Sequence, residues 1–111
     1  MKTEQPILIT SVKAAADFSN TKSIFIGFDG NTCGNGSKAL GVLNANSALN
    51  EQAPVTTSGI ALVLSGAAVA LGAKLQSNAS GKAITFSSGE ANGYALDVAS
   101  GADELIRVKL I

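Results

Sequence analysis

The 111-residue chain contains no histidine and no tryptophan, and it has a single cysteine, Cys33. Histidine is the commonest general base and metal ligand near neutral pH, so a Ser-His-Asp or Cys-His catalytic site is excluded. One cysteine cannot form an internal disulfide, which fits a reducing compartment at synthesis. The eight acidic residues fall in expected loops or on outward strand positions. We therefore expect neither enzymatic activity nor a cofactor.

The chain also lacks an excess of charge of either sign. Eight Lys and Arg balance eight Asp and Glu, and no stretch concentrates the basic residues. Nucleic-acid binding needs a basic surface, so we expect no nucleic-acid partner. The N-terminus has neither the long apolar run nor the small-residue cleavage site of a secretory signal, which fits synthesis in the cytoplasm.

Long apolar runs are missing as well. Residues 53–73 carry no charge, but Pro54, three glycines and several hydroxyl side chains interrupt them. A membrane-spanning helix is predominantly apolar throughout, so we expect no membrane partner here. We interpret this stretch as two short strands and a turn.

One loop has part of the pattern of a metal site. Residues 29–34 place Asp29 and Asn31 at the first and third positions of a calcium loop and glycine at the sixth. Cys33 stands at the fifth position and Leu40 at the twelfth, where a bidentate carboxylate is needed. We therefore expect no metal site.

What the chain does have is glycine, alanine and short β-forming segments. Hydrophobic residues make up 46%, but alanine dominates them and only five residues are aromatic. Small side chains bury little apolar area, so the core is thin and the pattern favours support from an oligomer or a large partner. Short strands bounded by Gly, Ser or Asn predict an all-β domain, a small barrel or sandwich.

Alternation within the segments predicts which side chains face the core. The clearest strand is the last one, where Ile106, Val108 and Leu110 alternate with Arg107 and Lys109. By the same reasoning, residues 23–28 place Ile24, Ile26 and Phe28 on one face, with Phe25 on the other but also covered. The remaining inward positions are Ile84, Phe86, Tyr94, Leu96 and Val98, with Asp97 outward. Residues 11–18 instead predict a short helix, with Ser11 as N-cap and three alanines.

Taken in order, the segments resemble a known family. They are AAADF, SIFIGFDG, ALGV, PVTTSGIALVLSGAAVALGAKLQSNASGKA and NGYALDVASGADELIRVKL. This order, over residues 14–111, resembles the small capsid decoration (cement) proteins of tailed phages, similar in style to the lambda head-decoration protein. The resemblance implies a β-tulip fold, a homo-trimer at three-fold positions of the outer capsid surface, binding to the major capsid protein, and stabilisation of the expanded head within the virion. The lambda protein has a proline-rich N-terminal region, whereas this chain has only Pro6 and Pro54.

Two sets of apolar residues are the candidates for these contacts. Residues 1–13 form either an N-terminal arm or a first strand, and residues 14–111 form a single domain. In the arm, the candidates for gripping the capsid, by adding a strand to a sheet edge of the coat protein, are Ile7, Leu8, Ile9 and Val12. The candidates for subunit contact are Val63, Val69 and Leu71.

Two alternative functions remain at this point. The same β domain suits another virion accessory protein, such as a head-fibre base or a tail component. A carbohydrate-binding module would normally offer an exposed aromatic platform, and the few aromatic residues here fall mostly on positions expected to face the core.

Overall fold

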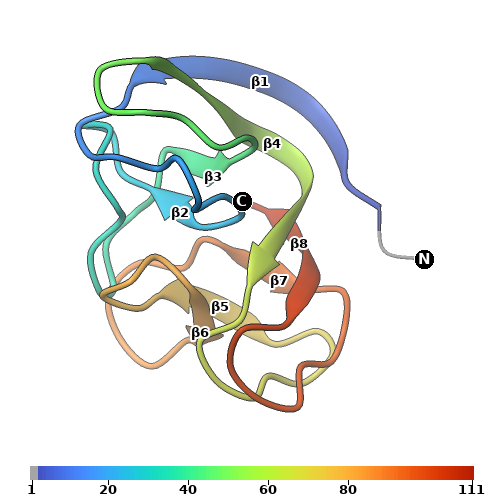
Figure 1. Ribbon diagram of the computed structural model, residues 1–111. Coiled ribbons are helices and arrows are strands. Elements are labelled where there is room, and N and C mark those ends of the chain that lie inside the picture. The colour runs from blue at the N-terminus through green and yellow to red at the C-terminus, as the bar shows by residue number, and fades with distance from the viewer. Residues whose placement is uncertain (1–2) are drawn as a thin grey trace.

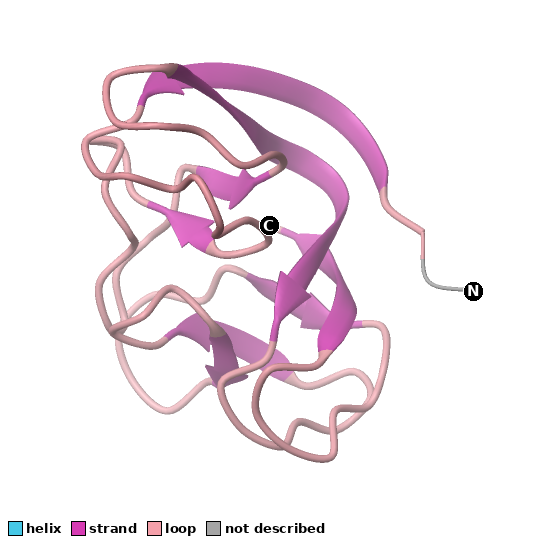
Figure 2. Cartoon of the chain, viewed as in Figure 1, coloured by secondary structure: helices cyan, strands magenta, loops and turns pink. Residues whose placement is uncertain are grey.

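The computed structural model describes residues 3–111, and within them it contains eight strands and no helix (Figures 1 and 2). The strands are β1 (Gln5–Lys13), β2 (Phe25–Ile26), β3 (Gly41–Leu43), β4 (Gln52–Leu64), β5 (Lys74–Ser77), β6 (Ala83–Thr85), β7 (Gly93–Ala95) and β8 (Leu105–Leu110). Most are short and are separated by long loops (Figure 2). The prediction of a small all-β domain of short strands is confirmed.

All eight strands belong to one antiparallel sheet, and β4 organises it. The order is β2-β3-β4-β8-β7-β5-β6, with β1 paired to β4 outside this path. Val55 of β4 pairs with Thr10 of β1 and with Leu43 of β3. Because one residue cannot pair with two strands on the same side, β1 lies along one side of β4 while β3 and then β8 lie along the other.

The extent of β4 differs from the prediction. We expected two short strands and a turn over residues 53–73, but one 13-residue strand runs through Pro54 and Gly59 as far as Leu64. Gly59 has φ +97°, and a Cβ atom there would lie 2.5 Å from the Gln5 carbonyl oxygen. The glycine therefore permits both an unusual backbone conformation and the close approach of β1. The loop before β4 covers residues 44–51, and the next loop begins after Leu64.

The predicted helix over residues 11–18 is wrong. Ser11 pairs with Pro54 inside β1, and the backbone N–H groups of Ala14 and Ala15 donate to the carbonyl oxygens of Glu51 (2.8 Å) and Gly30 (3.1 Å). Helix propensity favours alanine by less than about 1 kcal/mol per residue. Burial of Ala14 and Phe18 in the core, together with these hydrogen bonds, outweighs that preference.

Two clusters of apolar side chains make up the core, and β2 lies between them. Phe25 belongs to the first cluster, with residues of β4, β5 and β8, whereas Ile24 and Ile26 belong to the second, with residues of β3 and β4. This confirms the alternation predicted for residues 24–26 and the covering of Phe25. Phe28 does not continue the pattern: the strand ends at Ile26, and the Phe28 side chain is 67% exposed.

The alternation of β8 is confirmed, because Ile106 and Val108 are fully buried and Lys109 is exposed. The face predicted for β7 is wrong, since Tyr94 is exposed and its neighbours Gly93 and Ala95 are buried. A Cβ atom on Gly93 would lie 2.5 Å from a methyl carbon of Val108. The β8 side chain fills this space, so only very small residues of β7 can face it.

The predicted inward and outward faces are also wrong in the segments beside β7. Beyond it, Val98 is 61% exposed and Leu96 is half-buried, whereas Ala99 is buried. On β6, Ala83 is fully buried while Ile84 is half-buried. Phe86, just after β6, is also half-buried. In these segments the neighbouring alanines face the core, and the larger side chains that we expected there do not.

Candidate interaction surface

Ile7, the most exposed large hydrophobic residue among residues 3–111, lies on β1 with two further exposed ones, and β1 arches over the outside of the sheet (Figure 1). Ile7 is 82% exposed, Leu8 57% and Ile9 44%. Val12, at the other end of the strand, is half-buried and packs against the second core cluster. Of the four residues predicted to bind a partner, three therefore face solvent together and one attaches the strand to the domain.

Both faces of β1 are exposed over most of its length, since every residue from Gln5 to Ser11 is exposed, and its pairing with β4 is irregular. The register between β1 and β4 shifts between Pro6 and Leu8 and again between Leu8 and Ile9. Such irregularities twist and bend a strand and redirect its side chains. The Thr57 hydroxyl donates to the Leu8 carbonyl oxygen (3.1 Å), which holds the irregular segment against β4.

The outer edge of β1 has no strand partner among residues 3–111, since β1 pairs only with β4. Proteins usually protect such edges with charged residues, proline, bulges or very short strands. Here the nine-residue strand carries Pro6 near one end and Lys13 at the other, with six uncharged residues between them. It is bulged but long, and its exposed edge and apolar side chains form a surface that can pair with another chain.

The three residues predicted to contact a neighbouring subunit lie in different environments. Val63 and Val69 are buried in the first core cluster of their own chain, whereas Leu71 is 67% exposed. The backbone of Val69 exchanges hydrogen bonds with that of Ala99 (3.0 and 3.1 Å), so two loops lie side by side. The exposed apolar residues of these loops form what we call the tip patch: Ala67, Ala68, Ala70, Leu71 and Val98. Only Leu71 of the three candidates offers a surface to a neighbour.

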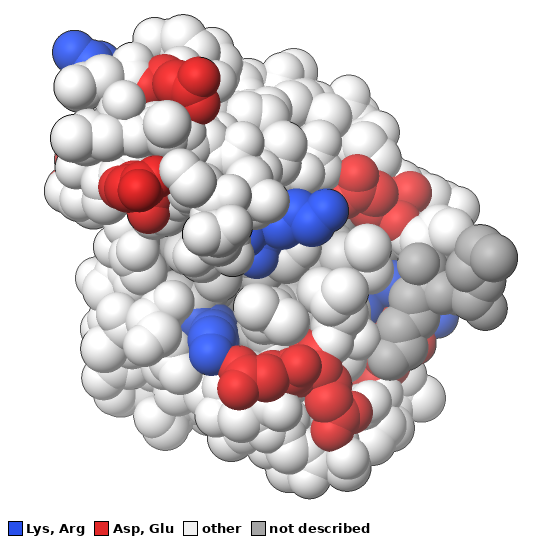
Figure 3. Space-filling model, in the orientation of Figure 1, with Lys and Arg blue, Asp and Glu red and all other residues white. Residues whose placement is uncertain are grey.

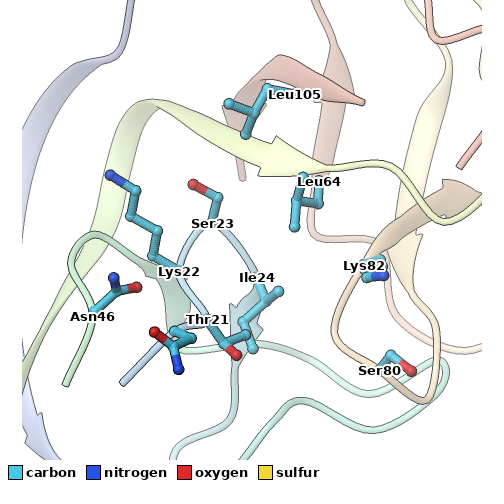
Figure 4. Close-up of a pocket in the computed structure, with 10 residues that line it drawn as sticks. Thr21, Lys22, Ser23, Ile24, Asn46, Leu64, Ser80, Lys82 and Leu105 are labelled. Atoms are coloured by element: carbon cyan, nitrogen blue, oxygen red, sulfur yellow. The ribbon is translucent and has the colours of Figure 1, made fainter. Parts of the chain in front are cut away.

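A cleft of about 520 Å³ lies beside residues 20–24, the end of β4, the start of β8 and the loop between β5 and β6 (Figure 4). Apolar side chains of Ile24, Leu64 and Leu105 lie within it, and Lys22 and Lys82 stand on opposite sides of it (Figure 4). The Lys82 ammonium forms an ion pair with Asp103. A second hollow, of about 350 Å³, shares Lys22 and Leu105 with this cleft. The cleft thus combines three apolar side chains with polar ones, Thr21, Ser23 and Ser80 among them, and with lysine at its rim.

Cys33 and the acidic residues are the remaining groups that could bind a metal or react as a nucleophile, and the contacts of Cys33 and Asp29 are structural. Within residues 3–111, no three His, Cys, Asp or Glu side chains gather as a metal site would require. Cys33 is buried and donates to the Ser37 carbonyl oxygen (3.3 Å), and burial raises the pKa of its thiol. The segment compared with a calcium loop contains a turn in which Asp29 accepts the Asn31 N–H (3.0 Å).

Two surface properties bear on the partners of the chain. Charged side chains are scattered over the face in Figure 3 without a large patch of one sign. Within the described part of the chain, no helix is long and apolar enough to cross a membrane.

The sequence reasoning missed the exposure of Phe28. The signal was present, because Asp29, Gly30 and Asn31 follow it and are typical turn residues. When a strand ends before such a turn, the alternation of inward and outward side chains stops there, and an apolar residue beyond the strand can be exposed. The exposure of Val98 had no comparable local signal.

Comparison with protein families identifies a match that covers almost the whole chain. No curated protein matches the chain. The family model described as phage cement protein matches residues 1–110, which is nearly the whole chain.

Proposed function

The chain belongs to the phage cement protein family, a family of structural phage proteins of the capsid, and from this premise we propose that it binds the outer surface of the expanded head as a homo-trimer at three-fold positions. There it contacts the major capsid protein and stabilises the shell. It carries out no catalysis and is made in the host cytoplasm before it joins the virion.

The observation that carries this proposal is the exposed apolar edge strand β1. Ile7, Leu8 and Ile9 face solvent beside an unpaired edge, at a cost in exposed apolar area that a partner removes. A coat-protein segment that adds a strand to β1 would satisfy its backbone groups and cover these side chains. The strand is already attached to β4, so little ordering cost accompanies binding.

Stabilisation of the shell follows from mass action. A protein that binds only the expanded shell must be released before that shell can change, so its binding free energy adds to the stability of the shell. Three β1 edges on one trimer make the later contacts effectively intramolecular, and weak single contacts become strong together. Leu71 of the tip patch is our candidate for contact between subunits of the trimer.

The direct experiment mixes the purified protein with expanded, undecorated heads and measures occupancy and the temperature at which the heads open. We expect saturable binding and heads that open at a higher temperature. A folded protein that leaves the heads undecorated at micromolar concentration contradicts the proposal.

A matched pair of variants tests the role of β1. The test variant, Ile7→Lys with Ile9→Lys, replaces two exposed apolar side chains on β1. The control variant, Leu49→Lys, replaces a 52% exposed apolar side chain outside β1. We expect the β1 variant to lose most head binding while its circular dichroism spectrum and melting temperature stay near those of wild type. Equal binding by both variants would remove β1 from the capsid contact.

A further inference from the structure

A rigid turn presents Phe28 to solvent. It spans residues 27–31 and is closed by two backbone hydrogen bonds, from Gly27 N–H to the Asn31 oxygen (2.8 Å) and from Gly30 N–H to the Gly27 oxygen (3.2 Å). Phe28 is 67% exposed on this turn, whereas the other three phenylalanine side chains are buried or half-buried. Few residues remove as much apolar area from water on binding as a phenylalanine, and here that area is left uncovered.

A carboxylate stands next to this ring. Asp29 accepts hydrogen bonds from the backbone N–H (3.0 Å) and the side-chain amide (3.4 Å) of Asn31, and these bonds lower the pKa of the carboxyl group. Asp29 forms no ion pair with any residue in the range 3–111. The turn therefore holds an aromatic ring and an unpaired negative charge in a fixed relation, and we call it the Phe28 knob.

The cleft described above has the complementary properties. Its volume of about 520 Å³ accommodates a phenyl ring, and Leu64 and Leu105 supply apolar contacts. Lys22, at its rim, is exposed and has no ion-pair partner in the described chain (Figure 4). Neither Lys22 nor Asp29 forms an ion pair with another residue in the range 3–111, although the whole chain has a formal net charge of zero.

We propose that the Phe28 knob of one copy of this chain inserts into the cleft of the next copy, with Asp29 paired to Lys22. This inference rests on the proposed trimer and identifies a contact that holds it together. The two surfaces differ, so the contact is heterologous, and a three-fold rotation closes it into a ring with no unpaired knob. Opposite charges at the rim set the register of the contact, while the buried ring supplies most of its affinity.

Charge complementarity selects a second copy as the occupant. Of the apolar side chains in the tip patch, those of residues 67–71 lie in an uncharged loop, and Asp97 beside Val98 is already paired with Arg107. Binding of an uncharged apolar patch in the cleft would leave Lys22 at the rim without an ion-pair partner. The Phe28 knob explains both the apolar lining and the charge.

The first test measures self-association by sedimentation velocity over a range of concentrations. We expect Phe28→Ala, Asp29→Lys and Lys22→Glu each to weaken association by roughly tenfold or more, since truncating an interface anchor has effects of this size. The double variant Asp29→Lys with Lys22→Glu should regain most of the lost association. Lys109→Glu, at another exposed lysine, is the matched control and should leave it unchanged.

The second test, by chemical crosslinking, also detects the contact if the chain forms trimers only when it is bound to the head. Asn31→Cys with Ser80→Cys keeps Phe28, Asp29, Lys22 and Leu105 and places one thiol on the knob and one at the cleft, and a short bismaleimide links them when copies are in contact. Because Cys33 is buried, it should not react. We expect crosslinked products of two and three chains, and none larger, in solution or on decorated heads. Neither single-cysteine variant should give these products.

These outcomes separate this contact from the proposed function. Normal head decoration without any crosslink overturns the knob-and-cleft contact and leaves the cement function intact. A ladder extending beyond three chains overturns the closed ring. If Lys22→Glu lowers head binding while self-association stays unchanged, the cleft receives the coat protein and the contact between copies is wrong.

Discussion

At the level of single residues, Asp97 forms a bidentate ion pair with Arg107. Its carboxylate accepts the backbone N–H of Arg107 (2.9 Å) and both Nε and a terminal nitrogen of the same guanidinium (3.0 Å each). These bonds raise the pKa of Arg107 above its usual value. The pair joins the segment after β7 to β8, and it is partly buried on the Asp97 side.

We expect Asp97→Asn to lower the free energy of unfolding by about 1–2 kcal/mol, because it weakens three hydrogen bonds in a partly screened location. Urea denaturation measures this change. Glu90→Gln, at an exposed carboxylate, is the control and should change the midpoint little. Equal stability of both variants would mean that solvent screens the Asp97 pair completely.

Cys33 allows a second prediction at this scale. Its side chain is 1% exposed, and burial raises the pKa of the thiol, so the reactive thiolate is scarce in the folded protein. A maleimide at neutral pH should label the native chain far more slowly than the chain in urea, as followed by mass spectrometry. Rapid labelling of the folded protein would show that the first core cluster opens readily.

At the scale of the strands, Gly59 controls how β1 attaches to β4. A Cβ atom at this position would lie 2.5 Å from the Gln5 carbonyl oxygen and 2.7 Å from the Ile7 nitrogen, at a φ of +97°. Gly72 also has a positive φ, +79°, but a Cβ atom there would meet nothing within 4 Å. The two glycines therefore separate the effect of close contact from the effect of backbone conformation.

We expect Gly59→Ala to detach the first half of β1, because the new methyl group occupies the space of the β1 backbone. Hydrogen exchange should then lose protection in residues 5–9 and keep it in β8, and head binding should fall. Gly72→Ala should lower stability by about 1 kcal/mol without either change. Retained protection of β1 in Gly59→Ala would mean that β4 can shift to make room.

At the scale of the whole molecule, a thin core and a surface rich in apolar side chains go together. The first cluster contains five alanines and one phenylalanine, and large side chains such as Ile7, Phe28 and Leu71 face solvent. Area that a single subunit leaves uncovered is available to stabilise an assembly. The stability of such a protein depends on the state of assembly.

We therefore expect the melting temperature of the isolated protein to rise with protein concentration, since unfolding of a trimer releases three chains. Differential scanning calorimetry at several concentrations measures this rise, and the Phe28→Ala variant should show a smaller one. A constant melting temperature, in a range where sedimentation finds trimers, would mean that the subunits are fully stable alone.

The sequence alone determined the features that depend on composition and on local periodicity. The absence of histidine excludes a Ser-His-Asp or Cys-His site wherever the chain folds, and the alternation of β8 identifies its core face because strand side chains have a period of two. The spacing of glycine-bounded segments likewise predicted the all-β class. The order of these segments led to the phage cement family.

Only the tertiary structure decided which surfaces are exposed, because burial depends on residues far apart in the chain. Long-range pairing with β4 made residues 11–13 part of a strand despite the helix propensity of the alanines that follow, and Val108 forced the small residues of β7 inward. The same contacts buried Val63 and Val69 inside their own subunit. What remained uncovered, at β1, Leu71 and the Phe28 knob, is the surface that the proposed assembly uses.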